Sequence, residues 1–227
     1  MTNTLHRFGT AESFVDDYVI IALPAKGGGQ SGDPIPALRR FLEIAIEYNP
    51  VNIGDAIHGS SMRPTKHSKA LEHFGTRPTT PDFQTVLDGI NAATTFSAVF
   101  ATRDDAEAFV QRIAKEDLGI SINISTSLEN AQNCCKAAGL TRHSVGYSLG
   151  FEGIRDNAPN RHVLALSTMC GHGMISQSLA KKMIDFVKEN RRSPEQVTAA
   201  LSRFCSCGIF NPVRARRIIE EARKKTF

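Results

Sequence analysis

Hydrophobic and polar positions along the first two thirds of the chain switch repeatedly between strand-like and helix-like spacing. Short β-branched or apolar runs bounded by Gly, Pro or capping residues predict strands, and apolar positions three and four residues apart predict helices. The predicted strands are residues 17–24, 51–57, 96–101, 120–125 and 144–149. The predicted helices are residues 33–48, 80–93, 102–117 and 127–139. This alternation predicts an α/β fold, with an α+β fold as the alternative.

The last third of the chain is mainly helical in pattern. The run 162–167 predicts one more strand, and the helices are expected at residues 175–190, at 193–203 and from 211 onward. Residues 204–210 have no helical pattern. Because no linker rich in Gly, Ser or Pro precedes this part, we expect residues 1–160 to form an α/β domain. A metal-binding helical subdomain, residues 161–227, should be continuous with it.

Composition and charge narrow the class of protein. The net charge of +4 is too small and too dispersed to predict a nucleic-acid binder, although it suits a small anionic substrate. No apolar run approaches the ~20 residues of a membrane span, and none resembles a signal peptide. We therefore expect a cytoplasmic protein that does not enter the membrane, and a homo-oligomer is compatible with the sequence. Its five cysteines should be ligands, reactive groups or core residues before they are disulfides.

Two close pairs of soft-metal ligands stand out in the C-terminal third. Cys170-Gly-His172 and Cys205-Ser-Cys207 each lie outside a predicted helix, shortly before the next helix begins. Small neighbouring residues leave the backbone free to turn around an ion. Thiolate and imidazole groups are the ligands that zinc, copper and iron–sulfur centres use. A helix N-terminus beside each pair would also favour thiolates. The sequence therefore predicts a metal centre here.

The spacing leaves the identity of the metal open. We expect an iron–sulfur cluster, with a zinc or copper ion as the alternative. His172 competes for the fourth ligand position with Cys134 and Cys135, of which at most one can face a shared site because neighbouring helical residues point about 100° apart. If a cysteine completes the set, His172 becomes an acid or base, and His143 is a second candidate for that role. The alternative without a metal is a cluster of buried core thiols.

Two further segments could bind an anion. The turn formed by Lys26, Gly27, Gly28, Gly29, Gln30 and Ser31 lies between a predicted strand and a predicted helix. Its backbone N–H groups could hold a phosphate or carboxylate, although it matches neither the Walker A nor the dinucleotide-binding pattern. Residues 58–80 read as a long basic loop with three histidines, which could cover an anionic substrate or simply be surface. A nucleophile elbow at Ser148 is disfavoured, because no helix is predicted to follow it.

These features support three hypotheses of different classes. The first is a cytoplasmic redox or sulfur-handling enzyme, an oxidoreductase or lyase, whose iron–sulfur cluster binds an anionic small substrate. The second is a zinc- or copper-binding module in which a closed tetrahedral site holds helices together and function lies in a partner surface. The third is a metal-free thiol enzyme with Cys170 as nucleophile and His172 as base.

Overall fold

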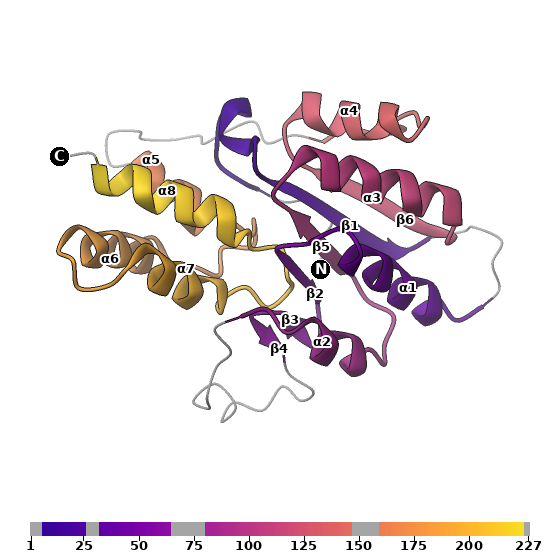
Figure 1. Cartoon of the computed structure of the whole chain (residues 1–227), viewed down its shortest axis with the longest axis horizontal. Coiled ribbons are helices and arrows are strands. Elements are labelled where there is room, and N and C mark those ends of the chain that lie inside the picture. Colours follow the sequence, from indigo (N-terminus) through magenta and orange to yellow (C-terminus); the bar gives the residue numbers. More distant parts are fainter. Residues whose placement is uncertain (1–5, 26–31, 65–79, 147–158, 225–227) are drawn as a thin grey trace.

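A six-stranded antiparallel sheet runs through the middle of the molecule (Figure 1). The structure is a computed structural model that describes residues 6–25, 32–64, 80–146 and 159–224. The strand order is β4-β3-β2-β5-β1-β6, and neighbouring strands pair antiparallel throughout. The strands are β1 (Tyr18–Pro24), β2 (Asn52–Asp55), β3 (Gly59–Ser60), β4 (Arg63–Pro64), β5 (Phe96–Phe100) and β6 (Ile120–Ser125). The predicted mixture of helices and strands is confirmed.

Helices of the first two thirds and of the last third form two separate groups (Figure 1). The first group contains α1 (Ile35–Ile46), α2 (Phe83–Gly89), α3 (Arg103–Glu116) and α4 (Leu128–Ala137). The second contains α5 (Arg161–Ser167), α6 (Gln177–Lys188), α7 (Pro194–Ser202) and α8 (Pro212–Lys224). A short 3₁₀ helix, Ala11–Phe14, precedes β1. Ser193 and Gln196 form a reciprocal capping box at the start of α7.

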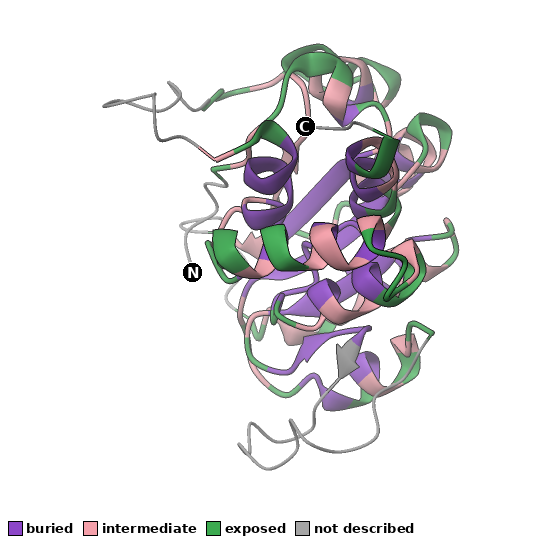
Figure 2. Ribbon diagram, turned by 90° about the vertical axis from the view of Figure 1, so that its left-hand side faces the viewer, coloured by how far each residue is buried: buried purple, intermediate pink, exposed green. Residues whose placement is uncertain are grey.

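Alternate residues of β1 enter two different hydrophobic cores, as the two-residue period of a strand requires. Val19 and Ile21 pack in the core formed with the second group of helices. Ile20 and Ala22 pack in the core formed with the first group. Figure 2 shows the buried strand residues between layers of helices. The helical subdomain thus shares its core with the sheet and does not form one of its own.

The run 162–167 is a helix, and the predicted strand there is wrong. The Asn160 side chain accepts a hydrogen bond from the backbone N–H of His162 and begins the helix. The positions from 162 to 167 are all buried, so their continuous apolar pattern cannot distinguish a buried strand from a buried helix. The length of this run does not distinguish a strand from a helix either, because short strands and short helices contain similar numbers of residues.

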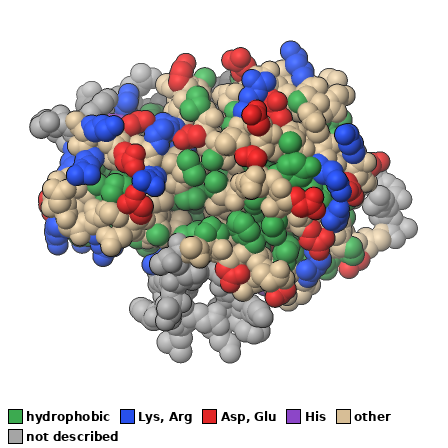
Figure 3. Space-filling view, viewed as in Figure 1, with side chains coloured by type: hydrophobic (Ala, Val, Ile, Leu, Met, Phe, Trp, Pro, Cys, Tyr) green, Lys and Arg blue, Asp and Glu red, His purple; other side chains and the backbone are tan. Residues whose placement is uncertain are grey.

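Two other segments differ from expectation in smaller ways. Residues 58–64 contain the short strands β3 and β4 where a loop was predicted. Residues 144–146 are not a strand, and residues 147–149 lie outside the described part of the chain, as do residues 65–79. None of the described helices is long and apolar enough to cross a membrane. Basic and acidic side chains are interspersed over the face shown in Figure 3.

Candidate metal centre

Both ligand pairs lie in loops that directly follow a helix. Cys170 comes three residues after the end of α5, and Cys205 comes three residues after the end of α7. Positive φ angles at Gly171 and Gly208 turn the chain back around each pair. The two loops meet because α5, α7 and α8 pack together in the core that also contains the three cysteines. Two pairs separated by 33 residues in sequence therefore share one site.

The four side chains form a closed ring of contacts. The sulfur of Cys207 lies 3.6 Å from the sulfur of Cys205 and 3.4 Å from Nδ1 of His172. The thiol of Cys170 interacts with the side chains of both Cys205 and His172. The three cysteines are buried, whereas His172 is half-buried. Its Nε2 atom is shielded from solvent and has no hydrogen-bond partner among the described residues.

The two distances from Cys207 agree with Cys205, Cys207 and His172 as ligands of a single ion. Tetrahedral zinc binds sulfur at about 2.3 Å and nitrogen at about 2.0–2.1 Å, which separates two sulfurs by roughly 3.8 Å and a sulfur from a nitrogen by roughly 3.5 Å. As the side chains stand, no group of three or more His, Cys, Asp or Glu in the described ranges meets the full geometric requirement of a metal site. The two measured edges, 3.6 and 3.4 Å, are nonetheless within a few tenths of an ångström of the tetrahedral values.

Without a metal, the thiols of Cys170 and Cys205 are poor nucleophiles. Contact with Cys205, followed by burial, raises the pKa of the Cys170 thiol to about 12. Contact with Cys170 lowers the pKa of Cys205, but hydrogen bonding to Cys207 and burial outweigh this effect and raise it to about 12. A backbone N–H, that of Phe210, donates to the sulfur of Cys205 at 3.3 Å. Since only the thiolate attacks or binds a metal, a bound cation would be needed to ionise these groups at neutral pH.

Along the chain, each pair lies closer to the C-terminus of the preceding helix than to the positive N-terminus of the next one. Each pair follows the C-terminus of a helix, and the next helices, α6 and α8, begin seven residues after Cys170 and five after Cys207. Each pair is therefore followed within a few residues by the next helix, as predicted, but neither pair lies in the first turn of that helix. Positive charge comes instead from Arg7, which interacts electrostatically with Cys170 and Cys205. Arg7 is distant in sequence and was not a candidate.

The Cys205–Cys207 loop is fixed to the sheet by close backbone packing. An added Cβ at Gly208 would lie 2.4 Å from the backbone N of Gly54 in β2, so only glycine fits. The hydroxyl of Ser97 in β5 donates to the carbonyl of Cys207 at 2.6 Å. The amide of Asn52 in β2 donates to the carbonyl of Phe210 at 2.9 Å. The centre is thereby held at the junction of the sheet and the second group of helices.

The competing ligands Cys134 and Cys135 are not part of this ring. Cys134 is buried in the core on the side of α1, α3 and α4, whereas Cys170, Cys205 and Cys207 lie in the other core. Cys135 is half-buried on α4, and His143 is exposed in the segment after α4. The sheet separates the two cores, which leaves His172 as the fourth member of the set. Lys26, Gly27, Gly28, Gly29 and Ser31 lie outside the described residues.

Sequence reasoning also missed a buried pair formed by Asp55 and His58. Nδ1 of His58 lies 2.9 Å from one carboxylate oxygen of Asp55, and the other oxygen accepts from the backbone N–H groups of Ile57 and His58, each at 2.6 Å. His58, expected at the surface, is only 6% exposed. The carboxylate holds the β2–β3 turn together. An Asp three residues before a His, between two strands, was the available signal.

Comparison of the chain with protein-family models, with curated protein sequences and with solved structures finds no match. The function has to be argued from the site itself.

Proposed function

We propose that this chain is a metalloprotein that binds one tetrahedral ion of the zinc type through Cys170, His172, Cys205 and Cys207. The observation that carries the proposal is that Cys207 contacts both Cys205 and His172, at 3.6 and 3.4 Å, with Cys170 interacting with Cys205 and His172. A single ion needs ligands this close. When bound, such an ion ionises its thiol ligands and joins the two loops through metal–ligand bonds.

The surroundings support a structural role for the ion. The three sulfurs are buried in a core shared by the sheet and helices α5–α8. A site with four protein ligands leaves no open position for a substrate. We infer that the ion fixes the C-x-H loop to the C-x-C loop, and that the C-x-C loop in turn fixes the C-terminal helices to β2 and β5. Function would then lie in a surface presented by the assembled domain.

The redox or sulfur-handling enzyme predicted from the sequence is a second proposal, and one observation favours it. His172 is the only half-buried member of the four, so its imidazole is the ligand that an anionic substrate could displace. A redox role with an iron–sulfur cluster would need sulfide as well as iron in the centre. Metal-free thiol catalysis is disfavoured, because a thiol with a pKa near 12, as at Cys170, is almost wholly protonated at neutral pH.

Metal analysis of the full chain tests these proposals. The protein is purified without oxygen and without a metal-affinity column, and zinc, iron, copper and acid-labile sulfide are measured together with the absorption spectrum. We expect one zinc per chain, no colour, and loss of zinc from Cys207→Ser. The matched control Cys135→Ser should retain the metal, because Cys135 lies on α4. Iron with sulfide and a brown colour would support the iron–sulfur enzyme, and metal-free protein would overturn both proposals.

A further inference from the structure

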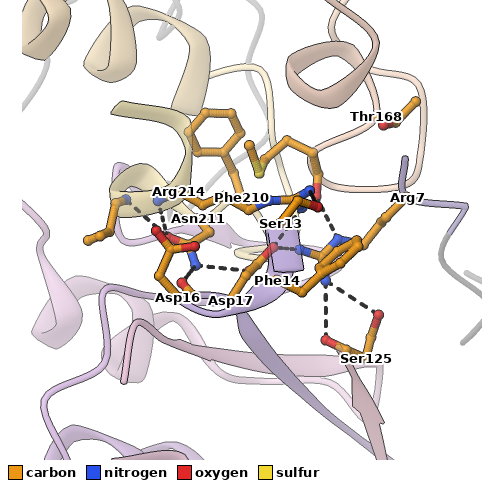
Figure 4. A network of polar contacts seen from close by, with 12 residues as sticks. Arg7, Ser13, Phe14, Asp16, Asp17, Ser125, Thr168, Phe210, Asn211 and Arg214 are labelled. Carbon is orange, nitrogen blue, oxygen red and sulfur yellow. Dashed lines mark hydrogen bonds and ion pairs between the residues drawn. The ribbon is translucent and has the colours of Figure 1, made fainter. Parts of the chain in front are cut away.

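A buried network of charges joins Arg7, Asp17 and Arg214 (Figure 4). One carboxylate oxygen of Asp17 accepts from Nη2 of Arg7 and, at 2.8 Å, from Nη1 of Arg214. The side chains of Arg7, Asp17 and Arg214 are 3%, 0% and 0% exposed. Both guanidinium groups also lie over the ring of Phe14. Two cations and one anion leave this triad with one buried net positive charge.

The triad is attached to the loop that carries Cys170 and His172. Nε of Arg7 donates to the carbonyl of Met169, the residue before Cys170, at 3.0 Å. The next residue, Phe8, donates its backbone N–H to the hydroxyl of Thr168 at 2.9 Å. Arg7 is therefore placed against the backbone of the loop that carries Cys170 and His172.

The charges of the triad and of a filled metal centre are complementary. Three thiolates, a neutral imidazole and a divalent ion carry one net negative charge. A buried net charge is costly in a protein interior unless an opposite charge compensates it. The triad supplies the single positive charge required. Asp16, the next carboxylate, pairs with Arg217, which also pairs with the partly exposed Glu221.

We propose that Arg7 is a positioning residue of the metal centre, whose buried positive charge compensates the net negative charge of a divalent ion held by three thiolates. This inference rests on the proposed function. It also defines the chemistry of the occupant: a thiophilic divalent cation leaves the centre and the triad neutral together, whereas a monovalent ion on the same three thiolates leaves an uncompensated negative charge.

Four variants of the full chain test the role of Arg7. Arg7→Gln removes the charge, Arg7→Lys keeps it, and Asp17→Asn removes the negative member of the triad. Arg142→Gln is the matched control, because Arg142 also donates to a backbone carbonyl, that of Leu128, away from the centre. Zn²⁺ affinity is measured by competition with a chromophoric chelator. Co²⁺ spectra report whether the ion is tetrahedral and thiolate-bound, and thermal unfolding of the metal-free forms reports stability separately.

We expect Arg7→Gln to weaken Zn²⁺ binding by roughly 10- to 100-fold, the range seen when partners of metal ligands are changed. Arg7→Lys and Arg142→Gln should stay within a few-fold of the wild type. Asp17→Asn should bind Zn²⁺ more tightly, a change of sign that lost stability alone does not produce. If Arg7→Gln does not fold, the Zn²⁺ affinity of Asp17→Asn relative to the wild type tests the inference in its place. The inference would be overturned if Arg7→Lys and Arg7→Gln weakened Zn²⁺ binding equally, or if Arg7→Gln left the affinity unchanged. Weaker Zn²⁺ binding by Asp17→Asn would also overturn it. Wild-type protein that binds neither Zn²⁺ nor Co²⁺ would overturn the proposed function itself, and this inference with it.

Discussion

Arg214 donates a hydrogen bond from Nη1 to a carboxylate oxygen of Asp17 over 2.8 Å, across 197 residues of sequence and with both side chains fully buried. Asp17 directly precedes β1, and Arg214 lies in the first turn of α8. Asn211, just before α8, reinforces the contact by donating to the other oxygen of Asp17 at 2.9 Å. These contacts hold α8 against the start of β1.

Removing the guanidinium of Arg214 should cost much of the stability of the fold. Burial lowers the pKa of Arg214 to about 10, so it is charged at neutral pH and pairs with Asp17. Because Arg7 still neutralises Asp17, we expect Arg214→Met to lower the free energy of unfolding by about 1.5–3 kcal/mol, the cost of removing a hydrogen bond to a buried charged group. Urea unfolding measures this. On the same helix, Arg216 pairs with Glu195 and Glu220 at the surface, and Arg216→Met should cost less than about 1 kcal/mol. Similar losses for both variants would contradict the role of burial.

Gly208 should tolerate no side chain. An added Cβ would lie 2.4–2.6 Å from the backbone of Ile53 and Gly54, and neither backbone can move without breaking the β2–β5 pairing. Gly208→Ala should therefore unfold the protein or destabilise it by more than about 3 kcal/mol, well above the ~1 kcal/mol typical of a point substitution. Gly139 is the control: it has a similar φ, +68° against +76°, but open space around it. Gly139→Ala isolates backbone strain, expected at about 1 kcal/mol. Equal effects in thermal unfolding would show that the contact with β2 is unimportant.

The stability of the protein should fall in alkaline solution, partly because of Cys134. Burial raises the pKa of this thiol to about 12, whereas an unfolded cysteine ionises near about 8.5. The folded pKa is the higher one, so this contribution is complete below about pH 8.5 and is lost as the pH rises toward 12. The loss approaches about 1.4 kcal/mol per pH unit in that interval. Urea unfolding at pH 7.5–10 should give a shallower decline for Cys134→Ala than for the wild type, and parallel curves would contradict the shift.

Alkylation should distinguish the five cysteines in the native protein. Cys135 is half-buried and the other four are buried, so iodoacetamide should modify Cys135 first. Removal of the ion with a chelator should expose Cys170, Cys205 and Cys207, while Cys134 stays protected in the opposite core. Mass spectrometry of digested protein reads each site. Protection of Cys170, Cys205 and Cys207 that does not change with chelator would show that burial alone, and no ion, guards them.

Local features of the fold could be predicted because their causes lie within a few residues. Thr102, Ser127 and Ser193 each accept a hydrogen bond from a backbone N–H three residues ahead. A capping pattern of this kind is visible in the sequence. Helix α5 was missed because its apolar run has no periodicity when every side chain is buried. Residues 144–146 are not the predicted strand and β3 and β4 were not predicted, whereas the other predicted elements differ from the structure chiefly at their ends, which depend on tertiary packing.

The candidate site likewise has features that local sequence predicts and features that only tertiary packing determines. The spacing of Cys170, His172, Cys205 and Cys207 determined which groups could bind a soft metal, because each pair can clamp an ion from one short loop. Sequence alone could not exclude Cys134, since that requires knowing that the sheet lies between the two cores. Nor could it find Arg7, whose partners Ser125 and Met169 are 118 and 162 residues away.

The four candidate ligands and the alternation of strands and helices could therefore be predicted from the sequence itself, because residue type and local spacing suffice for both. Tertiary structure alone decided that His172 and not Cys134 lies beside Cys207, that Gly208 must be glycine, and that Arg7 contacts the loop of Cys170. Each of these depends on packing between segments far apart in the chain. Long-range contacts of this kind have no periodicity or spacing that a single sequence can display.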